Sequence, residues 1–353
     1  MFLRFMIFII ASSYTYQNTY SQGVNRADDH APISVMGDHY HSAGEVMFSY
    51  RYMSMAMEGS QIGSSKISSD LIATTIPNRF SSMDGQPPTL RIVPTKMTMN
   101  MHMLGAMYAP ADWITLMAMV NYLDNEMHHS TYKGMMGTTV RGSFTTKTSG
   151  LGDTKFSALI RARETESDRL HITAGISIPT GDLDQTATIL NPMGMKPTIR
   201  APYGMQLSSG TNDFIGGLTY SQFHDGWSWG TQWQSTIRTG TNDENYTLGD
   251  EHRITGWYSR PFPFTSNFSW STRAEYFNRG NIQGMDSKIM GPVQTADPDN
   301  YGANRISIGL GINFATGSGH RVALEYVIPI QQDLKGPQLK AENQMTLGYQ
   351  FTF

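Results

Sequence analysis

Residues 342–353 read ENQMTLGYQFTF, and every second residue from Met345 to Phe353 is apolar or aromatic. A period of two residues is that of a β-strand with one apolar and one polar face. The same period recurs far upstream, as in residues 170–178 (LHITAGISI). The carboxyl-terminal stretch therefore belongs to a set of similar strands, and the sequence predicts an all-β chain.

Twelve segments carry this period. They span residues 44–57, 95–108, 113–123, 152–161, 170–178, 212–221, 227–238, 251–259, 266–277, 303–314, 320–329 and 342–353. An even number of strands lets a single-chain barrel close with both chain ends on the same side of a membrane. We therefore predict a transmembrane antiparallel β-barrel of about twelve strands.

The connections between these segments alternate in length. Short links fall at 109–112, 162–168, 223–226, 260–265 and 315–319, and long ones at 58–94, 124–150, 179–211, 239–250, 278–302 and 330–341. Short periplasmic turns and long external loops are typical of bacterial outer-membrane barrels, whereas a sandwich or propeller gives no reason for the alternation. The expected location is therefore the bacterial cell outer membrane, with its lipid as a partner.

Composition supports this fold class and excludes others. Only 39% of the 353 residues are hydrophobic, and from Gln22 onward no run of about 18 apolar residues is present that could form a spanning helix. The chain has no cysteine, which excludes disulfides, zinc-thiolate sites and cysteine nucleophiles. A net charge of -3 without Lys/Arg clusters argues against a nucleic-acid partner.

The amino terminus has the pattern of an export signal. A basic start at Arg4 precedes an apolar run, and small residues at Thr19 and Ser21 fit cleavage before Gln22. We predict a signal peptide over residues 1–21, a periplasmic leader over 22–43 and the barrel over 44–353. A buried amino-terminal strand is the alternative interpretation of residues 1–21.

Charged residues in the predicted strands share the polar phase, which would line the lumen. The predicted lumen-lining residues are Arg51, Asp153, Lys155, Arg161, Arg238, Arg273, Glu275, Arg305, Arg321 and Glu325, with Glu251 and Arg253 beside them. On the lipid side an Arg or Lys at the midplane would cost about 2–4 kcal/mol, so inward placement is favoured. These charges either brace a closed lumen or line a pathway for a solute.

Two short motifs and the final strand resemble known outer-membrane barrels. Residues 150–153 (GLGD) and 178–182 (IPTGD) flank one predicted hairpin. The pair resembles the outer-membrane transporter barrels grouped with the meta-pathway phenol-degradation proteins. The resemblance implies passage of small, often hydrophobic or aromatic compounds. The closing aromatic row resembles the signal by which the barrel assembly machinery recognises its substrates, which makes that machinery an expected partner.

Methionine and histidine concentrate in the first part of the chain. Sixteen of the 24 methionines lie between Met36 and Met136, and six of the ten histidines between His30 and His129. This bias is similar to that of a Met/His-rich subgroup of the same barrels associated with copper handling. Thioether sulfur suits Cu(I), and imidazole suits both copper oxidation states.

Strand phase selects the candidate metal ligands: Met53, Met55, Met57, His102, Met117, Met119, His39 and His41. In residues 97–103 (MTMNMHM) the methionines oppose Thr98, Asn100 and His102, so a polar lumen would place His102 inward and the methionines toward lipid. The alternatives are that methionine is a flexible apolar filler and that the leader is a solvated polar segment, and they stay open here.

The sequence thus favours a channel or transporter for small molecules. The alternative is a copper-binding or copper-passing barrel that uses lumenal Met and His, in which copper is the one metal or cofactor expected. No G-x-S-x-G motif or Ser-His-acid set can be placed, so an enzyme is not expected.

Overall fold

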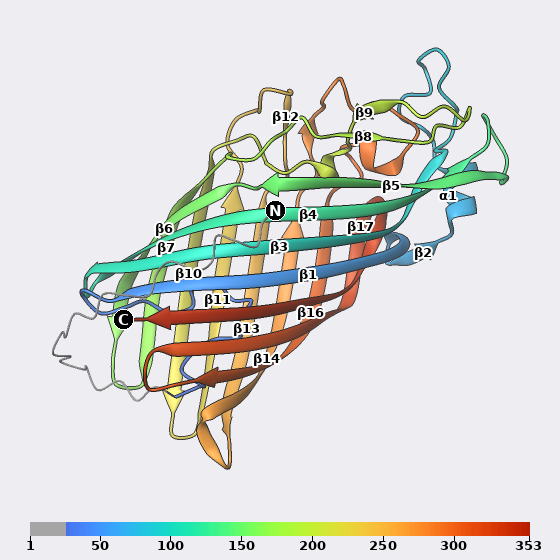
Figure 1. The fold of residues 1–353 in the computed structure, drawn as a ribbon. Coiled ribbons are helices and arrows are strands. Elements are labelled where there is room, and N and C mark those ends of the chain that lie inside the picture. The colour runs from blue at the N-terminus through green and yellow to red at the C-terminus, as the bar shows by residue number, and fades with distance from the viewer. Residues whose placement is uncertain (1–25) are drawn as a thin grey trace, which may run out of the picture.

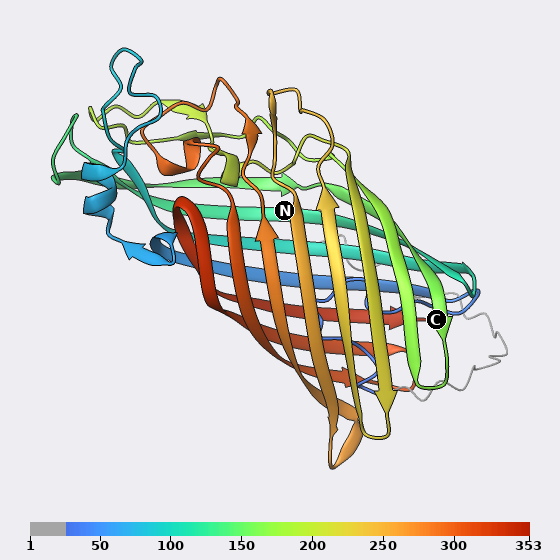
Figure 2. The ribbon, with the colours of Figure 1, turned by 180° about the vertical axis from the view of Figure 1, so that it is seen from behind.

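A computed structural model describes residues 26–353, and the predicted signal peptide lies outside the described residues. Thirteen strands form one antiparallel sheet, of which all except β2 and β5 close into a tilted barrel (Figures 1 and 2). The barrel strands are β1 (Val46–Gly63), β3 (Ile92–Ala111), β4 (Ile114–Tyr132), β6 (Thr154–Glu164), β7 (Asp168–Ile178), β10 (Asp213–His224), β11 (Trp227–Ile237), β13 (Glu251–Phe262), β14 (Thr265–Arg279), β16 (Ala303–Ala315) and β17 (His320–Thr352).

The last strand, β17, makes two passes through the barrel wall. Its residues up to Leu334 pair with β16, and its residues from Leu334 onward pair with β1, which closes the barrel. The two halves lie side by side, since Gln332 Nε2 donates to the Ala341 carbonyl at 2.8 Å. Gly336 has a φ of 70°, a value that favours glycine at the reversal between them. The eleven labelled strands therefore supply twelve passes, and the predicted fold class is confirmed.

Smaller elements lie at the end of the barrel that carries the long loops. They are β2 (Ser65–Ile67), β5 (Val140–Leu151), β8 (Thr186–Thr188), β9 (Thr198–Arg200), β12 (Tyr246–Thr247), β15 (Gln283–Gly284), the helix α1 (Ser69–Thr75) and the 3-10 turns Tyr203–Met205 and Gln294–Ala296. The carboxyl end of β17 lies at the opposite end, among the short turns (Figure 1). Within residues 26–353, no helix is long and apolar enough to span a membrane.

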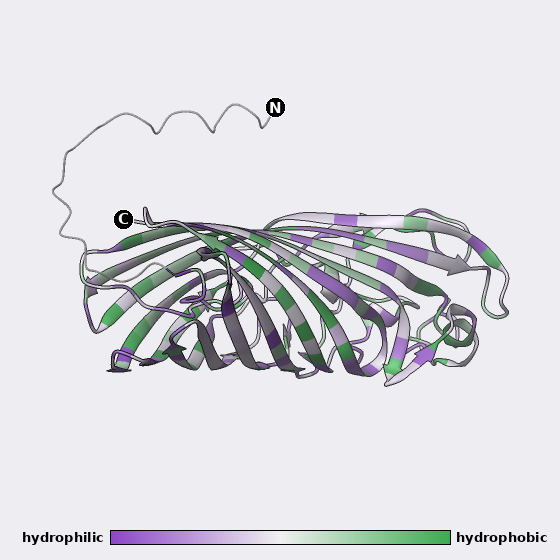
Figure 3. Cartoon of the chain, turned by 90° about the horizontal axis from the view of Figure 1, so that it is seen from below, coloured by the Kyte–Doolittle hydropathy of each residue, from purple (hydrophilic) through white to green (hydrophobic). Residues whose placement is uncertain are grey.

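Hydrophobic and hydrophilic residues alternate along the strands (Figure 3). On β1, Phe48 is 54% exposed on the outer face, whereas Arg51 is 6% exposed on the inner face. An apolar outer face is the one that lipid solvates, and the inner face keeps the polar groups. The two-residue period of the sequence therefore sets which side of the wall each residue occupies.

The predicted boundaries are wrong at two long loops. Residues 124–150 hold the end of β4 and most of β5, which pair from Tyr122 to Tyr132 with a register shift after Thr131, and residues 330–341 lie within β17. Polar residues occupy both faces of these extensions, as in the 2.7 Å ion pair between Glu126 and Lys147. One face of the β4–β5 extension is buried, for example at Asn125, Met127 and His129. Because polar residues occur on both faces, the apolar period that marks a membrane strand is absent, and the sequence alone suggests a loop.

The two motifs of the sequence meet at a break in the barrel wall. β6 pairs with residues 114–119 at the start of β4, and β5 pairs with residues 122–132 at its end. Gly152 and Asp153 lie between β5 and β6, where the pairing partner of β4 changes. Thr180 Oγ1 donates to the Gly152 carbonyl at 2.7 Å. A Cβ on Gly181 would lie 2.2 Å from the Leu151 carbonyl oxygen. The motif pair thus fastens the loop after β7 against this break.

Gly181→Ala should destabilise the barrel by about 1–3 kcal/mol, because its Cβ meets backbone that no side-chain rotation can move aside. Gly216→Ala in β10 is the matched control, since a Cβ there meets nothing within 4 Å. The measurement is the temperature at which a sample, heated before electrophoresis, loses the gel band of the folded barrel. Equal temperatures for the two variants would contradict this role of the motif.

Candidate functional site

The amino-terminal segment, residues 26–45, lies inside the barrel and crosses its lumen. Its carbonyls accept hydrogen bonds from wall side chains: Ser269 Oγ donates to Ala27 O at 2.9 Å and Gln232 Nε2 to Met36 O at 3.0 Å. Its backbone also donates, from His41 N to Thr115 Oγ1 at 2.9 Å. These partners come from β14, β11 and β4, so the segment is anchored to walls on different sides of the lumen.

Two buried charged residues of β17 hold the middle of this segment. Glu325, which is completely buried, accepts from the Ser34 backbone N–H at 3.1 Å and from Arg273 Nε at 2.6 Å. Arg321 donates to the Ala31 carbonyl at 2.6 Å. Ser34 Oγ and Thr346 Oγ1 are 3.0 Å apart. The turn that includes Ser34 is therefore fastened to the wall by buried ionic and hydroxyl contacts.

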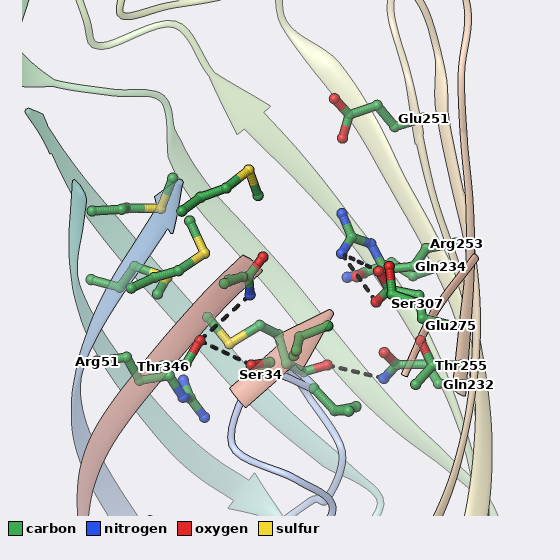
Figure 4. A pocket seen from close by; sticks show the side chains of 18 of the residues that line it. Ser34, Arg51, Gln232, Gln234, Glu251, Arg253, Thr255, Glu275, Ser307 and Thr346 are labelled. Atoms are coloured by element: carbon green, nitrogen blue, oxygen red, sulfur yellow. Dashed lines mark hydrogen bonds and ion pairs between the residues drawn. The ribbon is translucent and has the colours of Figure 1, made fainter. Parts of the chain in front are cut away.

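A cavity of about 310 Å³ lies directly against this segment, in the middle of the barrel (Figure 4). Ser34, Val35 and Met36 form part of its lining. Sulfur atoms gather on one side of the cavity, opposite the labelled Arg253 and Glu275 (Figure 4). The lining is therefore divided into a thioether side and an ionic side.

The thioether side comes from three neighbouring strands. Its methionines are Met53 and Met55 on β1, Met101 and Met103 on β3, and Met117 and Met119 on β4. Two of these pairs were expected on the lumen from strand phase, and Met57 lies further along β1. The β3 pair was expected to face lipid.

The facing of β3 is the reverse of the one inferred from its polar residues. His102 lies on the outer face, where its Nδ1 is 2.7 Å from the hydroxyl of Tyr50, which is 39% exposed. Asn100 likewise accepts from the Tyr52 hydroxyl at 3.0 Å. Pairing of His102 with outward Tyr52 fixes this register, and tyrosine hydroxyls satisfy the polar groups on that face. The expectation of an inward His102 ligand was wrong.

The ionic side carries more cations than anions. It consists of Glu251 and Arg253 on β13, Arg273 and Glu275 on β14, and Arg305 on β16. Arg51 and Lys155 add two cations to the lining. Arg253 and Glu275 are paired at 3.2 Å, whereas Arg305 lies 5.1 Å over the ring of Phe277. Five cationic and two anionic side chains give the cavity a positive potential.

The other predicted lumen residues lie outside the cavity lining. Asp153 accepts hydrogen bonds from Ser209 N at 3.1 Å and Ser209 Oγ at 2.7 Å, in the loop before β10. Arg238 pairs with Asp213 at the outer end of β10. Arg161 lies at the short-turn end, over the ring of Tyr40 at 5.5 Å. These residues secure loops and the amino-terminal segment.

A cluster of apolar residues, here called the external methionine layer, lies between the cavity and the external loops. Its members are Met57, Met97, Met99, Met127, Ala187, Ala201, Met205 and Leu339. Beyond it, loop residues pack into their own core around Phe80, Tyr203 and Tyr246. Packed methionines and loop residues thus occupy the external side of the lumen, and no periodicity in the sequence indicated this packing.

The leader histidines lie in the buried part of the amino-terminal segment. His39 and His41 are 8% and 6% exposed, and their rings are 5.0 Å apart. Burial lowers the pKa of His41 and of His30. Burial alone would raise the pKa of Asp38, but the adjacent His39 and nearby cations hold it well below its usual range. The imidazoles of His30 and His41 are therefore neutral near pH 7, and the Asp38 carboxylate is ionised.

Comparison with solved structures identifies the fold. An outer membrane channel from Pseudomonas putida F1 matches with a TM-score of 0.58 over 90% of this chain and 99% of that one, at 14% identity. The toluene transporter of Ralstonia pickettii (TM-score 0.46, 12% identity, 94% and 96% covered) and a FadL homologue of Pseudomonas aeruginosa (TM-score 0.43, 9%, 93% and 98%) also match. No protein-family model and no curated protein matches the chain.

The likeness to the Pseudomonas putida channel establishes an outer-membrane barrel fold. The closed wall and its apolar outer face fit that assignment, because a barrel has no unpaired strand edge and meets lipid with apolar side chains. The chain has the fold of a bacterial outer-membrane β-barrel.

Proposed function

We propose that this outer-membrane barrel is a channel for small molecules that combine an apolar body with an anionic group. Two observations support it: the division of the cavity into a thioether side and an ionic side, and the excess of five cations over two carboxylates in the whole lining. Small-molecule sites are concave, mostly apolar and fitted with a few polar groups that set orientation. The cavity of about 310 Å³ is at the lower end of the usual range for such sites.

Aromatic acids fit both sides of this cavity. Methionine sulfur makes favourable contacts with aromatic rings, and its flexible side chain adapts to rings of different shape. A carboxylate on the ring would face Arg253 and Arg305, of which Arg305 has no carboxylate within ion-pair distance among the described residues. This substrate class agrees with the aromatic compounds implied by the resemblance of the GLGD and IPTGD motifs.

Passage requires movement at both closures. On the external side, the layer around Met97 and Met127 consists of flexible side chains that can change rotamer without breaking hydrogen bonds. On the other side, the turn at Ser34 must leave Glu325 and Thr346. We propose that the cavity passes the solute without changing it chemically.

Osmotic swelling of proteoliposomes that contain the full mature chain tests this proposal. Benzoate should enter faster than benzylammonium, a cation of similar size, and faster than glucose, which lacks an apolar body. Equal rates for benzoate and benzylammonium would contradict selection by the excess positive charge of the lining. Absence of swelling with all three solutes would contradict a channel.

Copper passage is the second candidate, supported by six methionine side chains on one wall of one cavity. Thioether sulfur is a soft ligand that selects Cu(I), and neighbouring strands supply sulfurs that a single strand cannot. Exchange among six equivalent sulfurs would let an ion move without leaving its ligands.

Leucine keeps the volume of methionine but offers no sulfur. If this second candidate is correct, replacing all six methionines of the thioether side by leucine should therefore abolish Cu(I) binding: Met53, Met55, Met101, Met103, Met117 and Met119. The measurement is a Cu(I) titration of the folded barrel in detergent against a competing chelator. Met193 and Met195, exposed in an external loop, are replaced by leucine in the control. Absence of tight binding in the unmodified chain would reduce the methionines to apolar packing.

A further inference from the structure

Three histidines of the amino-terminal segment form a cluster in which each ring keeps one nitrogen without a hydrogen bond. The rings of His30 and His39 have their centroids 4.6 Å apart, and those of His39 and His41 are 5.0 Å apart. One ligand atom each of His30, Asp38 and His39 lie within 4.8 Å of one another. Among the described residues, this is the one group of three or more His, Asp or Glu side chains close enough to share a metal ion.

Each of these histidines keeps one buried ring nitrogen without a partner. The unpaired atoms are Nδ1 of His30 and Nε2 of His39 and of His41. A buried polar atom without a hydrogen bond is unfavourable, and three such nitrogens occur in this one cluster. The His30 side chain retains 28% exposure, which leaves a route for an ion.

The other ring nitrogens of two histidines face carboxylates. His39 Nδ1 lies 2.9 Å from Asp38 Oδ1, and His41 Nδ1 lies 3.3 Å from Glu45 Oε2. A carboxylate only accepts, so each Nδ1 carries a proton and each Nε2 is the ring nitrogen that remains for a ligand. A carboxylate that orients the far nitrogen of a ligating histidine is the usual support of protein metal sites.

We propose that His30, Asp38 and His39, with the adjoining His41, form a binding site for a divalent transition-metal ion of the zinc and copper(II) class, in which Glu45 orients His41. Imidazole suits these ions, and a set of three histidines is a known zinc arrangement. The carboxylate of Asp38 offsets the positive charge of Arg321, which lies nearby and bonds to Ala31. The proposed ligands include no sulfur, although Asp38 and His39 line a small pocket together with Met117 and Met119 of the methionine wall.

An ion at this site would tie residue 30 to residues 39 and 41. The chain between them carries Ala31, Ser34 and Met36, which make the contacts with β17 and β11 described above. The ion would therefore fasten the closure of the cavity in the same way as the buried contacts of Glu325 do.

Titration of the folded full-length mature chain with zinc chloride against a competing chelator tests the site. We expect one ion per barrel, with affinity reduced at least a hundredfold by the double substitution His39→Gln/His41→Gln. Asp38→Asn should weaken binding about 10–100-fold, as loss of an orienting carboxylate does. His102→Gln, on the outer face, and the methionine-to-leucine variant should bind as the unmodified chain does. Folding of every variant is checked by heat-modifiable gel mobility.

Copper(II) supplies an independent readout. Its electron paramagnetic resonance spectrum should show hyperfine coupling to imidazole nitrogen in the unmodified chain and fewer coupled nitrogens in His39→Gln/His41→Gln. Absence of a stoichiometric ion, or equal zinc affinity in that folded variant, would overturn the proposal. Neither result depends on solute passage, so failure of the metal site and failure of the channel are distinguishable.

Discussion

Deletion of residues 27–41 should raise the ion conductance of the barrel in planar bilayers several-fold. This segment crosses the lumen beside the cavity and is held by wall residues that include Glu325, Arg321 and Gln232. The wall itself closes through strand pairing of β1 with β17, so it does not need the segment to stay intact. Removal therefore opens the lumen at that end without opening the barrel.

The control for this deletion is Glu166→Gln, an exposed position in the β6–β7 turn at the same end of the barrel. It should leave the conductance unchanged. The deletion also leaves Glu325 paired with Arg273, so its charge is not stranded. An unchanged conductance in a folded deletion variant would show that the external methionine layer alone closes the lumen.

The double substitution Lys155→Gln/Arg305→Gln should lower the preference of the open channel for chloride over potassium to near unity. Both side chains line the cavity, and their loss leaves three cations against two carboxylates. A lumen with low-dielectric walls focuses the field of its charges, so removal of two cations has a large effect on ion selectivity. Neither side chain has a carboxylate within ion-pair distance among the described residues, so no buried anion is orphaned.

The measurement is the reversal potential under a potassium chloride gradient, made in the deletion variant so that current is large. Lys147→Gln is the matched control, because Lys147 pairs with Glu126 on the β4–β5 extension outside the cavity. It should leave the reversal potential in place. A shift of equal size in both variants would mean that the external surface, and not the cavity, sets selectivity.

The barrel was predictable because its physical rule is local. A two-residue period assigns each residue of a membrane strand to lipid or lumen, and Phe48 and Arg51 lie on the faces that the period gives them. The methionines of β1 and β4 follow the same rule and reach the cavity.

The facing of β3 was not predictable from that rule. Thr98, Asn100 and His102 are polar, yet the last two satisfy tyrosine hydroxyls of β1 on the outer face. Whether a polar residue can face outward depends on its cross-strand neighbour, and that register is set by pairing between distant segments. The methionines of residues 97–103 therefore face the lumen, whereas the sequence predicted that they face lipid.

The position of residues 26–45 inside the lumen could not be predicted from the sequence for a similar reason. Residues 26–45 have no period, and their position depends on side chains of β4, β11, β14 and β17 that meet only in the closed barrel. His39 and His41 were singled out by their spacing, but His30 joins them only through the turn at Asp38.

A reversible lock on the amino-terminal segment tests the central claim, that solute passes through the cavity and displaces this segment. The chain has no cysteine, and Ser34 Oγ and Thr346 Oγ1 are 3.0 Å apart, so Ser34→Cys/Thr346→Cys adds a single disulfide between segment and wall. Benzoate swelling of proteoliposomes should fall on oxidation and return on reduction, while either single variant responds to neither. Swelling that is equal in the oxidised and reduced double variant would contradict the claim, because the solute would then pass without moving the segment.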